Sequence, residues 1–472
     1  MRDHPALYTG EEQRKLLWEQ VIEIVEEHFR DVTKLRVSPI LEKDKILEAA
    51  NQFQLDTPLD PEVWLPKVIS FLKDHIVHVD HPMYYGLYNP KPNFASILAD
   101  LVTATFNPQM AAWSHAPYAV EIEQLLVHQV GKRMGYPTSC QGIFGAGGAE
   151  ANLTAVICAL NNRFPDYAKT GLFGIKRRPI IYVSEHAHHS IIKAASSIGL
   201  GMESVQTIDV DKMLKMHTGS LIDQIKEDRS NGKIPFMVVS TVGATGTGTI
   251  DPISPIRKIA DDNNMWLHID AAWGGAVSLF ESHRHLTDGI EKSDSITFDI
   301  HKWMSVPMGT SMYLTRHTDI LNRSFRITAD YMPKDGDTLQ VMDPYTHSIQ
   351  WSRKFLGLRF YFALLMYGWS GYESMVSEKL RLGAYLKNRL TEESWNVVYH
   401  TPLPVVCFED GLTNLLKSSE EICQHLNDSG KTWLSTYPIS GKSYLRACIT
   451  NFMTTENEID HLIQLLNQAR SN

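Results

Sequence analysis

The sequence has few cysteines and no pattern among them. Its 472 residues include five cysteines, an odd number, and no CxxC pair. A disulfide framework needs paired cysteines and a cysteine-based zinc site needs closely spaced ones, so both are excluded. We expect reduced, buried thiols at all five positions: Cys140, Cys158, Cys407, Cys423 and Cys448.

Long apolar runs and an excess of positive charge are also lacking. No stretch reaches the roughly 18 apolar residues that a membrane helix requires, and the start, MRDHPALYTGEEQRK, lacks the apolar centre of a signal peptide. The formal net charge is −9 and the pI is about 6.1, so the chain lacks the excess of positive charge that is typical of nucleic-acid-binding proteins. We therefore expect a cytoplasmic protein that binds neither nucleic acid nor membranes.

No internal repeat or low-complexity tract divides the chain, so its organisation follows from hydrophobic periodicity. Residues 1–100 are predicted to form a helical segment whose apolar stripe packs on the body of the chain or, as we expect, on a partner subunit. Residues 101–366 alternate β-branched runs such as FMVVSTVG with helix-like segments, which predicts an α/β domain with a mainly parallel sheet. Residues 367–472 are predicted to form a small α+β domain with strands at VVCFED and YLRACIT.

Two charged residues close apolar runs, where surface charges would be unexpected. Asp270 ends WLHID and Lys302 follows SITFDIH. Ligands of α/β proteins gather at the carboxyl ends of parallel strands. A lysine amine can carry pyridoxal 5′-phosphate (PLP) as a Schiff base, and a carboxylate can hold the proton on the pyridine nitrogen, so that the ring accepts electrons. The pair indicates a PLP enzyme, with two solvated surface charges as the alternative.

A glycine cluster at Gly145, Gly147 and Gly148 leads directly into a helix-like run. Glycines let the backbone approach a phosphate closely, and the N–H groups at a helix start attract an anion. We therefore place the cofactor phosphate here. The segment VGATGTGTID is also glycine-rich, but no helix opens at once after it, so a dinucleotide site is rejected.

Three histidines, His186, His188 and His189, follow the strand-like run IIYV. No acidic or thiol ligand recurs nearby at metal spacing, so we predict no metal site. A histidine at a strand end can instead stack on a pyridine ring and handle protons. The histidines of HRH at 283–285 are assigned to a solvated helix.

The stretch from Ser324 to Ser348 is polar and contains an isolated Tyr331. It is either a surface loop or a lid that closes over the site and brings in Tyr331 as an acid. Arg353, in QWSRKF, is either a fork for a carboxylate or phosphate or a solvated cation.

Eight motifs occur in a familiar order: HPMYYGLY, NPQMAAW, GAGGAEANL, SEHAHHS, STVGAT, HIDAAW, DIHKW and QWSRKF. Together they resemble the PLP-dependent group II amino-acid decarboxylases, in the branch that holds aromatic-L-amino-acid decarboxylase. The resemblance runs in register from about His81 to Leu380. It implies PLP fold type I, the aspartate aminotransferase-like α/β fold, and a homodimer with active sites at the subunit interface.

The resemblance also implies roles for individual residues. Lys302 corresponds to the Schiff-base lysine, Asp270 to the partner of the pyridine nitrogen, and His188 to the ring-stacking histidine. Tyr331 resembles the loop tyrosine that protonates Cα. The remaining residues expected to contact the cofactor, some of them from the partner subunit, are Gly147, Gly148, Ala149, Thr245, Ala272, Asp299, His301, Trp351 and Ser352.

Substrate choice is expected to depend on a second group of residues, namely Tyr84, Leu87, Gln109, Ala111 and Ser352. By this resemblance, Leu87 occupies the position at which glutamate and cysteine-sulfinate decarboxylases carry Gln. The leucine disfavours an acidic substrate. By the same resemblance, Gln109 and Ala111 occupy positions at which animal aromatic decarboxylases carry bulkier, more apolar residues, so the shape of the substrate pocket is expected to differ. Ser352 resembles the serine of plant enzymes that favour phenolic substrates.

The expected activity is decarboxylation of an L-amino acid, most simply an aromatic one, to an amine and CO2. The alternatives are an aromatic aldehyde synthase on the same fold, a decarboxylase of a non-aromatic amino acid, and a non-catalytic scaffold. Tyr rather than Phe at position 331 disfavours the aldehyde synthase, and intact Lys302, Asp270 and His188 disfavour the scaffold.

Overall fold

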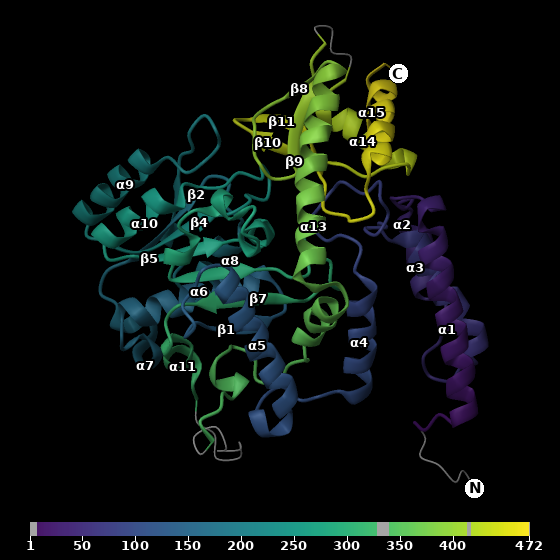
Figure 1. Cartoon of the computed structure of the whole chain (residues 1–472), viewed down its shortest axis with the longest axis horizontal. Helices are drawn as coiled ribbons and strands as arrows, with labels where there is room; N and C mark the ends of the chain where they lie inside the picture. The colour runs from purple at the N-terminus through teal and green to yellow at the C-terminus, as the bar shows by residue number, and fades with distance from the viewer. Residues whose placement is uncertain (1–6, 328–338, 413–416, 472) are drawn as a thin grey trace.

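The computed structural model describes residues 7–327, 339–412 and 417–471 of the chain. A large sheet with helices on both faces lies beside a small C-terminal sheet, and the first three helices form an arm along one side of the molecule (Figure 1). The helices before the large sheet are α1 (Glu11–Asp31), α2 (Lys43–Ala50), α3 (Pro61–His75), α4 (Phe94–Phe106) and α5 (Pro117–Arg133).

Strands and helices then alternate, as the sequence predicts for an α/β domain. The strands are β1 (Gln141–Gly145), β2 (Pro179–Ser184), β3 (Val205–Ile208), β4 (Ile234–Thr241), β5 (Trp266–Asp270), β6 (Ser295–Phe298) and β7 (Ser311–Thr315). The α-helices among and after them are α6 (Gly148–Arg163), α7 (Tyr167–Thr170), α8 (Ser190–Ser197), α9 (Thr218–Ser230), α10 (Ile253–Asp262) and α11 (Ile320–Phe325).

The large sheet confirms the predicted, mainly parallel arrangement. Over the described residues its seven strands lie in the order β1-β7-β6-β5-β4-β2-β3. The pairs from β3 through to β6 are parallel, whereas β7 runs antiparallel to both β1 and β6. The parallel strands end at one edge, which brings the segments that follow them close together.

Both faces of this sheet are covered, which explains why its central strands are rich in apolar residues and buried along their length. Tyr182 and Val238 join a core cluster with residues of α5, α9 and α10, while their neighbours Ile181 and Val239 join another with residues of α6, α8 and α11. Strands buried on both faces read as continuous apolar runs rather than alternating ones. The fold class predicted from the sequence is therefore confirmed.

The C-terminal part contains a second sheet, with the antiparallel order β10-β11-β9-β8. Its elements are β8 (Trp395–Val397), β9 (Val405–Asp410), α14 (Ser419–Ser429), β10 (Ser435–Ile439), β11 (Lys442–Cys448) and α15 (Glu456–Ser471). The predicted strands VVCFED and YLRACIT coincide with β9 and most of β11. α13 (Gly357–Glu392) leads from the large sheet to the small one, with a kink at Gly368, where φ is 63°. The predicted boundary between residues 366 and 367 falls beside this kink, and the division into three domains stays a prediction.

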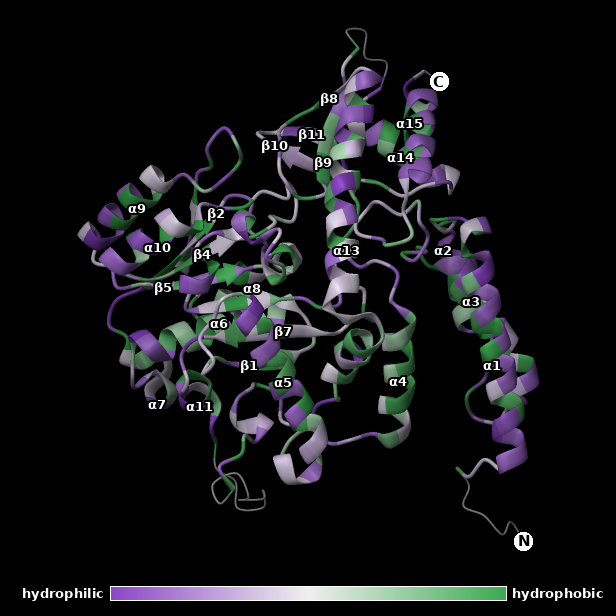
Figure 2. Cartoon of the chain, in the orientation of Figure 1, coloured by the Kyte–Doolittle hydropathy of each residue, from purple (hydrophilic) through white to green (hydrophobic). Residues whose placement is uncertain are grey.

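α1 confirms the predicted amphipathic helix, but none of its residues is buried within the chain. Leu16, Trp18, Ile22 and Val25 are exposed apolar side chains. Figure 2 shows hydrophobic and hydrophilic residues mixed along α1, α2 and α3, in contrast to the hydrophobic strands of the large sheet. None of the described helices is both long and apolar enough to cross a membrane.

Two smaller sequence predictions have different outcomes. All five cysteines are buried and free, as expected. The assignment of residues 283–285 to a solvated helix holds only in part: Arg284–Thr287 forms a short 3-10 helix in which His285 is exposed, whereas His283 precedes it and is partly buried, with Nε2 2.7 Å from Ser377 Oγ. A short polar motif does not reveal that α13 packs against it.

Candidate active site

The candidate active site lies where the parallel strands of the large sheet end. Asp270 is the last residue of β5, His188 follows β2, and Lys302 follows β6. The glycine cluster lies between β1 and α6. Because these ends meet at one edge of the sheet, residues far apart in the sequence converge on one site.

Asp270 is held by hydrogen bonds from neutral donors. The residue is 5% exposed; Oδ2 accepts a hydrogen bond from Asn152 Nδ2 at 2.9 Å, and Oδ1 accepts one from Ala272 N at 3.2 Å. A buried carboxylate is stabilised best by a paired positive charge. The site can therefore hold a protonated ring nitrogen against Asp270.

A chain of hydrogen bonds orients Asn152. A carboxylate only accepts, so the amide nitrogen of Asn152 faces Asp270 and its oxygen faces His268 Nε2, at 3.0 Å. Nε2 must then donate. Burial lowers the pKa of His268 to about 4, so the ring is neutral and Nδ1 accepts from Ser295 Oγ at 2.8 Å. Ser295 Oγ in turn accepts from Trp266 Nε1 at 2.8 Å.

Lys302 lies in the turn after β6, together with Asp299. Its Nζ is 2.9 Å from Asp299 Oδ2, and its side chain is 24% exposed, whereas that of Asp299 is 2% exposed. Asp299 Oδ1 is buried and has no hydrogen-bond partner within the described part of the chain. The neighbours Ile300 and Trp303 are fully buried and anchor this turn. The lysine amine is thus held at the open side of a rigid segment.

His188 faces the same group of charges. His188 is exposed in the chain by itself, and the partial desolvation imposed by its surroundings lowers the pKa of its imidazole; the Asp270 carboxylate acts in the opposite direction and Lys302 adds to the lowering. Its Nδ1 accepts a hydrogen bond from Ser190 N at 3.2 Å, which fixes the plane of the ring. An oriented, exposed imidazole that interacts with Asp270 and Lys302 suits stacking on an aromatic ring.

The start of α6 lies next to Asp299. A Cβ on residue 148 would lie 2.7 Å from Asp299 Oδ2, so this approach requires glycine. The N–H groups of the first helical turn have no partners within the helix and favour an anion. A carboxylate repels phosphate, so Asp299 is better explained as the partner of Lys302 than as a phosphate ligand. Gly147, Gly148 and the exposed Ala149 supply the backbone N–H groups.

Three further residues expected to contact the cofactor lie around this centre. Ala272 connects Asp270 to the Lys302 turn, because its carbonyl accepts a hydrogen bond from Asp299 N at 2.8 Å. The Thr245 carbonyl accepts one from Tyr88 at 2.6 Å. His301 is buried, and its Nδ1 contacts the backbone of Thr310, so its ring is fixed beside Gly147.

The expected substrate-binding residues form two separate groups. In the first, Gln109 Nε2 donates to Ser352 Oγ at 3.1 Å and Gln109 Oε1 accepts from Ala111 N at 3.1 Å. In the second, the Tyr84 hydroxyl accepts from Leu87 N at 3.2 Å. Within the described part of the chain, neither group is hydrogen-bonded to Lys302 or Asp270.

Three of the expected site residues are tyrosine or tryptophan, and the structure describes two of them. Tyr84 stacks on Trp433, and Trp351 lies 4.9 Å from Tyr345, centroid to centroid. Tyr331 lies outside the described residues, so its predicted role as an acid stays a prediction.

Arg353 does form a fork, but on the protein itself. Its guanidinium spans both carboxylate oxygens of Glu123, with Nη1 3.0 Å from Oε1, and both side chains are 2% exposed. The alternative of a solvated cation is therefore wrong. Glu123 Oε1 also accepts hydrogen bonds from Leu356 N and Gly357 N, which fixes the start of α13.

Sequence reasoning missed Asn152 and His268, which orient Asp270. Asn152 lies on an otherwise apolar face of α6 and is 1% exposed, and His268 is fully buried in β5. A buried polar residue inside an apolar run needs a partner. That signal was present in the sequence, but it does not name the partner.

Comparisons with known proteins agree with this geometry. Residues 50–410 match the family model described as the pyridoxal-dependent decarboxylase conserved domain. The chain is 26% identical over 461 residues to an aromatic-L-amino-acid decarboxylase of Bacillus atrophaeus, covering 96% of this chain and 94% of the relative.

Two solved structures have the same fold. Oryza sativa TDC with PLP and tryptamine superposes with a TM-score of 0.91 at 19% identity, covering 99% of both chains. Mouse CSAD in apo form superposes with a TM-score of 0.90 at 23% identity, covering 97% of this chain and 98% of the other.

Proposed function

Because this chain belongs to the pyridoxal-dependent decarboxylase family, we propose that it removes the α-carboxyl group of an aromatic L-amino acid to give an amine and CO2. PLP-dependent decarboxylation of an amino acid follows from the family and its decarboxylase relative. The aromatic substrate and the residue roles are the proposal. One observation carries the residue roles: Asp270, His188 and the amine of Lys302 converge at the carboxyl ends of β5, β2 and β6.

The residues present fit PLP. Asp270 is a buried carboxylate held by neutral donors, and a protonated ring nitrogen would supply the positive charge that it lacks. The free N–H groups at the start of α6 suit a phosphate. When bound, the cofactor supplies an aldehyde that reacts with amines and a ring that accepts the electron pair of the broken bond.

Each residue then has a distinct task. Lys302 holds the cofactor through its amine until the substrate amine replaces it, and Asp299 is positioned to take and return the lysine proton. Asp270 keeps a proton on the ring nitrogen, and His188 covers the ring face. Asn152 and His268 act through Asp270 as positioning residues, because they fix the orientation of its carboxylate.

The aromatic preference is supported by Leu87 and by the name of the Bacillus atrophaeus relative. A leucine side chain offers no hydrogen bond to a substrate carboxylate, and burying that charge unpaired is costly. Ser352, held by Gln109, supports a phenolic ring because its hydroxyl can pair with a substrate hydroxyl. Tyr331 is proposed as the acid that returns a proton to Cα.

We also propose a homodimer in the cytoplasm. The exposed apolar side chains of α1 are a surface that a second subunit would cover, and Trp351 and Ser352 would reach the partner's site. The five free, buried cysteines support a reducing compartment. Light scattering of the purified protein tests the dimer directly, and a monomer at all concentrations would contradict it.

One assay tests the activity and its alternatives. Purified protein with PLP is given a panel of L-amino acids, and amine, CO2, aldehyde, ammonia and peroxide are measured. Equal amounts of amine and CO2 from aromatic substrates support the proposal. Aldehyde with ammonia and peroxide identifies an aldehyde synthase, and a non-aromatic best substrate identifies another decarboxylase. If no amino acid shifts the absorption band of the cofactor, the protein is a non-catalytic scaffold.

A further inference from the structure

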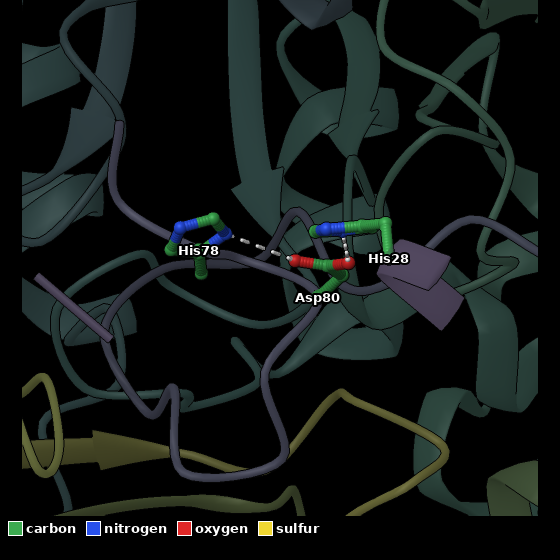
Figure 3. A group of neighbouring side chains, drawn as sticks. All are labelled: His28, His78 and Asp80. Carbon is green, nitrogen blue, oxygen red and sulfur yellow. Dashed lines mark hydrogen bonds and ion pairs between the residues drawn. The ribbon is translucent and has the colours of Figure 1, made fainter. Parts of the chain in front are cut away.

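Three potential metal ligands meet away from the candidate active site, where the arm contacts the body of the chain. His28 lies near the end of α1, and His78 and Asp80 lie in the segment that follows α3 (Figure 3). One ligand atom from each residue lies within 4.8 Å of the others. His28 Nε2 is 2.6 Å from Asp80 Oδ2, and His78 Nδ1 is 3.9 Å from Asp80 Oδ1. We call these residues the arm cluster.

The orientation of His78 is the main argument. Its Nε2 lies 2.9 Å from the Lys73 carbonyl oxygen, which only accepts, so Nε2 carries the hydrogen. In a neutral ring, Nδ1 then presents a lone pair. His78 is 2% exposed, and Nδ1 is buried with no hydrogen-bond partner among the described residues. Metal-binding histidines characteristically donate their other ring N–H to a carbonyl or carboxylate in this way.

In the neutral form that binds a metal, His78 Nδ1 presents its lone pair toward Asp80 Oδ1, 3.9 Å away. In that form the two facing acceptors are unfavourable unless a cation, here a metal ion, lies between them. Figure 3 shows both imidazole rings turned toward the Asp80 carboxylate. The His28 and Asp80 side chains are 26% and 15% exposed, which leaves a path for an ion and room for water as a further ligand.

We propose that the arm cluster binds a zinc ion through His28 Nε2, His78 Nδ1 and one oxygen of Asp80. Two imidazoles and one carboxylate suit zinc, whereas magnesium and calcium prefer oxygen ligands. Zinc bonds of about 2.0–2.1 Å place tetrahedral ligands about 3.3 Å apart. His28 and Asp80 must therefore separate slightly and His78 must move closer, which are small side-chain shifts.

The consequence would be mechanical, because the ion would fasten α1 to the body of the chain. α1 has no buried residue of its own, and a metal bond would add to the few contacts that hold it, such as Phe29 against Phe94. The site does not involve the cofactor or the substrate. Its failure would therefore leave the proposed decarboxylase activity untouched.

The test uses the PLP-loaded protein, stripped with a chelator and titrated calorimetrically with zinc chloride. We expect about one ion per chain, with no change in the cofactor absorption band. His28→Gln and Asp80→Asn should each weaken binding by more than about 100-fold, since even changes next to the ligands cost about 10–100-fold. His425→Gln, on the exposed face of α14, is the matched control and should bind like the wild type.

The proposal would be overturned by the absence of saturable zinc binding in the wild type, or by unchanged binding in both His28→Gln and Asp80→Asn. A zinc X-ray absorption spectrum should report two imidazoles and oxygen, and any sulfur ligand would also overturn it. Trypsin cleavage at Arg14 and Lys15 should be several-fold slower with zinc in the wild type but not in His28→Gln. These variants keep His78, whose replacement in a buried position risks misfolding.

Discussion

Asn152 donates a hydrogen bond to Asp270 across 118 positions of sequence, with Nδ2 2.9 Å from Oδ2. The other side of the same amide accepts from His268 and from Thr297 Oγ1, the latter at 2.7 Å. The amide therefore cannot turn over without losing bonds on both sides. Its rigid donor fixes the carboxylate on which the chemistry of the ring nitrogen would depend.

Replacing Asn152 by Asp should make activity depend on pH in a specific direction. Two adjacent carboxylates raise each other's pKa, and Asp at position 152 can donate to Asp270 only while it is protonated. Asn152→Asp should therefore keep part of its activity at low pH and lose it as the pH rises, relative to the wild type. Asn152→Leu should lose about 10–100-fold at all pH values, the cost of one hydrogen bond to a charged group.

The pH profile of kcat/KM, measured for both variants, checks this prediction. A merely structural role for Asn152 would give two variants with the same loss at every pH. Equal thermal midpoints for wild type and variants would show that the fold is intact. Unchanged activity of Asn152→Leu would mean that Asp270 is oriented by other groups.

Lys302→Ala should abolish turnover while the fold persists. Its amine ends a side chain that is 24% exposed, so its removal leaves no buried cavity, and we expect kcat to fall roughly a thousandfold or more. The cofactor absorption band should change, because the covalent link is lost. Stopped-flow absorbance and amine release measure both effects. Normal turnover would refute the assignment of Lys302.

The sequence was sufficient to predict the functional residues at the strand ends, but not the distant residues that form hydrogen bonds with them. Asp270 and Lys302 were predicted because each closes an apolar run, and the parallel sheet followed from alternating β-branched and helical segments. The partners are long-range: Asn152 is 118 residues from Asp270, and Glu123 is 230 residues from Arg353. Local periodicity carries no information about which distant helix supplies a hydrogen bond. The arm cluster was not predicted from the sequence for the same reason, because His28 and Asp80 are 52 residues apart.

Glu123→Gln should destabilise the protein strongly. The substitution leaves Arg353 as a buried, unpaired charge, and it weakens the carboxylate that accepts from Leu356 N and Gly357 N. We expect a loss of about 3–5 kcal/mol in the free energy of unfolding. Glu281→Gln is the control, because Glu281 is 83% exposed and pairs with Arg284 at the surface, where the expected loss is below about 1 kcal/mol. Denaturant unfolding of both variants compares the losses directly, and equal losses would contradict this account of the Arg353 fork.

Substrate preference should depend on Leu87. We expect tyrosine, phenylalanine, dihydroxyphenylalanine or tryptophan to outcompete glutamate and aspartate in the wild type. Leu87→Gln should reduce that preference by roughly tenfold or more, because an amide donor can pair with a side-chain carboxylate. Values of kcat/KM for each amino acid give the ratio. Glutamate or cysteine sulfinate as the best wild-type substrate would refute the aromatic proposal.

Tyr331→Phe should change the product rather than only the rate. If the Tyr331 hydroxyl returns the proton to Cα, the phenylalanine variant keeps the aromatic ring but lacks the acid. Protonation of Cα after the loss of CO2 should then be slow. Dissolved O2 then takes up the electrons, and water completes the conversion to aldehyde, ammonia and hydrogen peroxide. The ratio of aldehyde to amine, measured in air and under nitrogen, should rise in air only. An unchanged amine yield at an unchanged rate would assign the proton to another residue, with His188 as the next candidate, because its imidazole interacts with both Asp270 and Lys302.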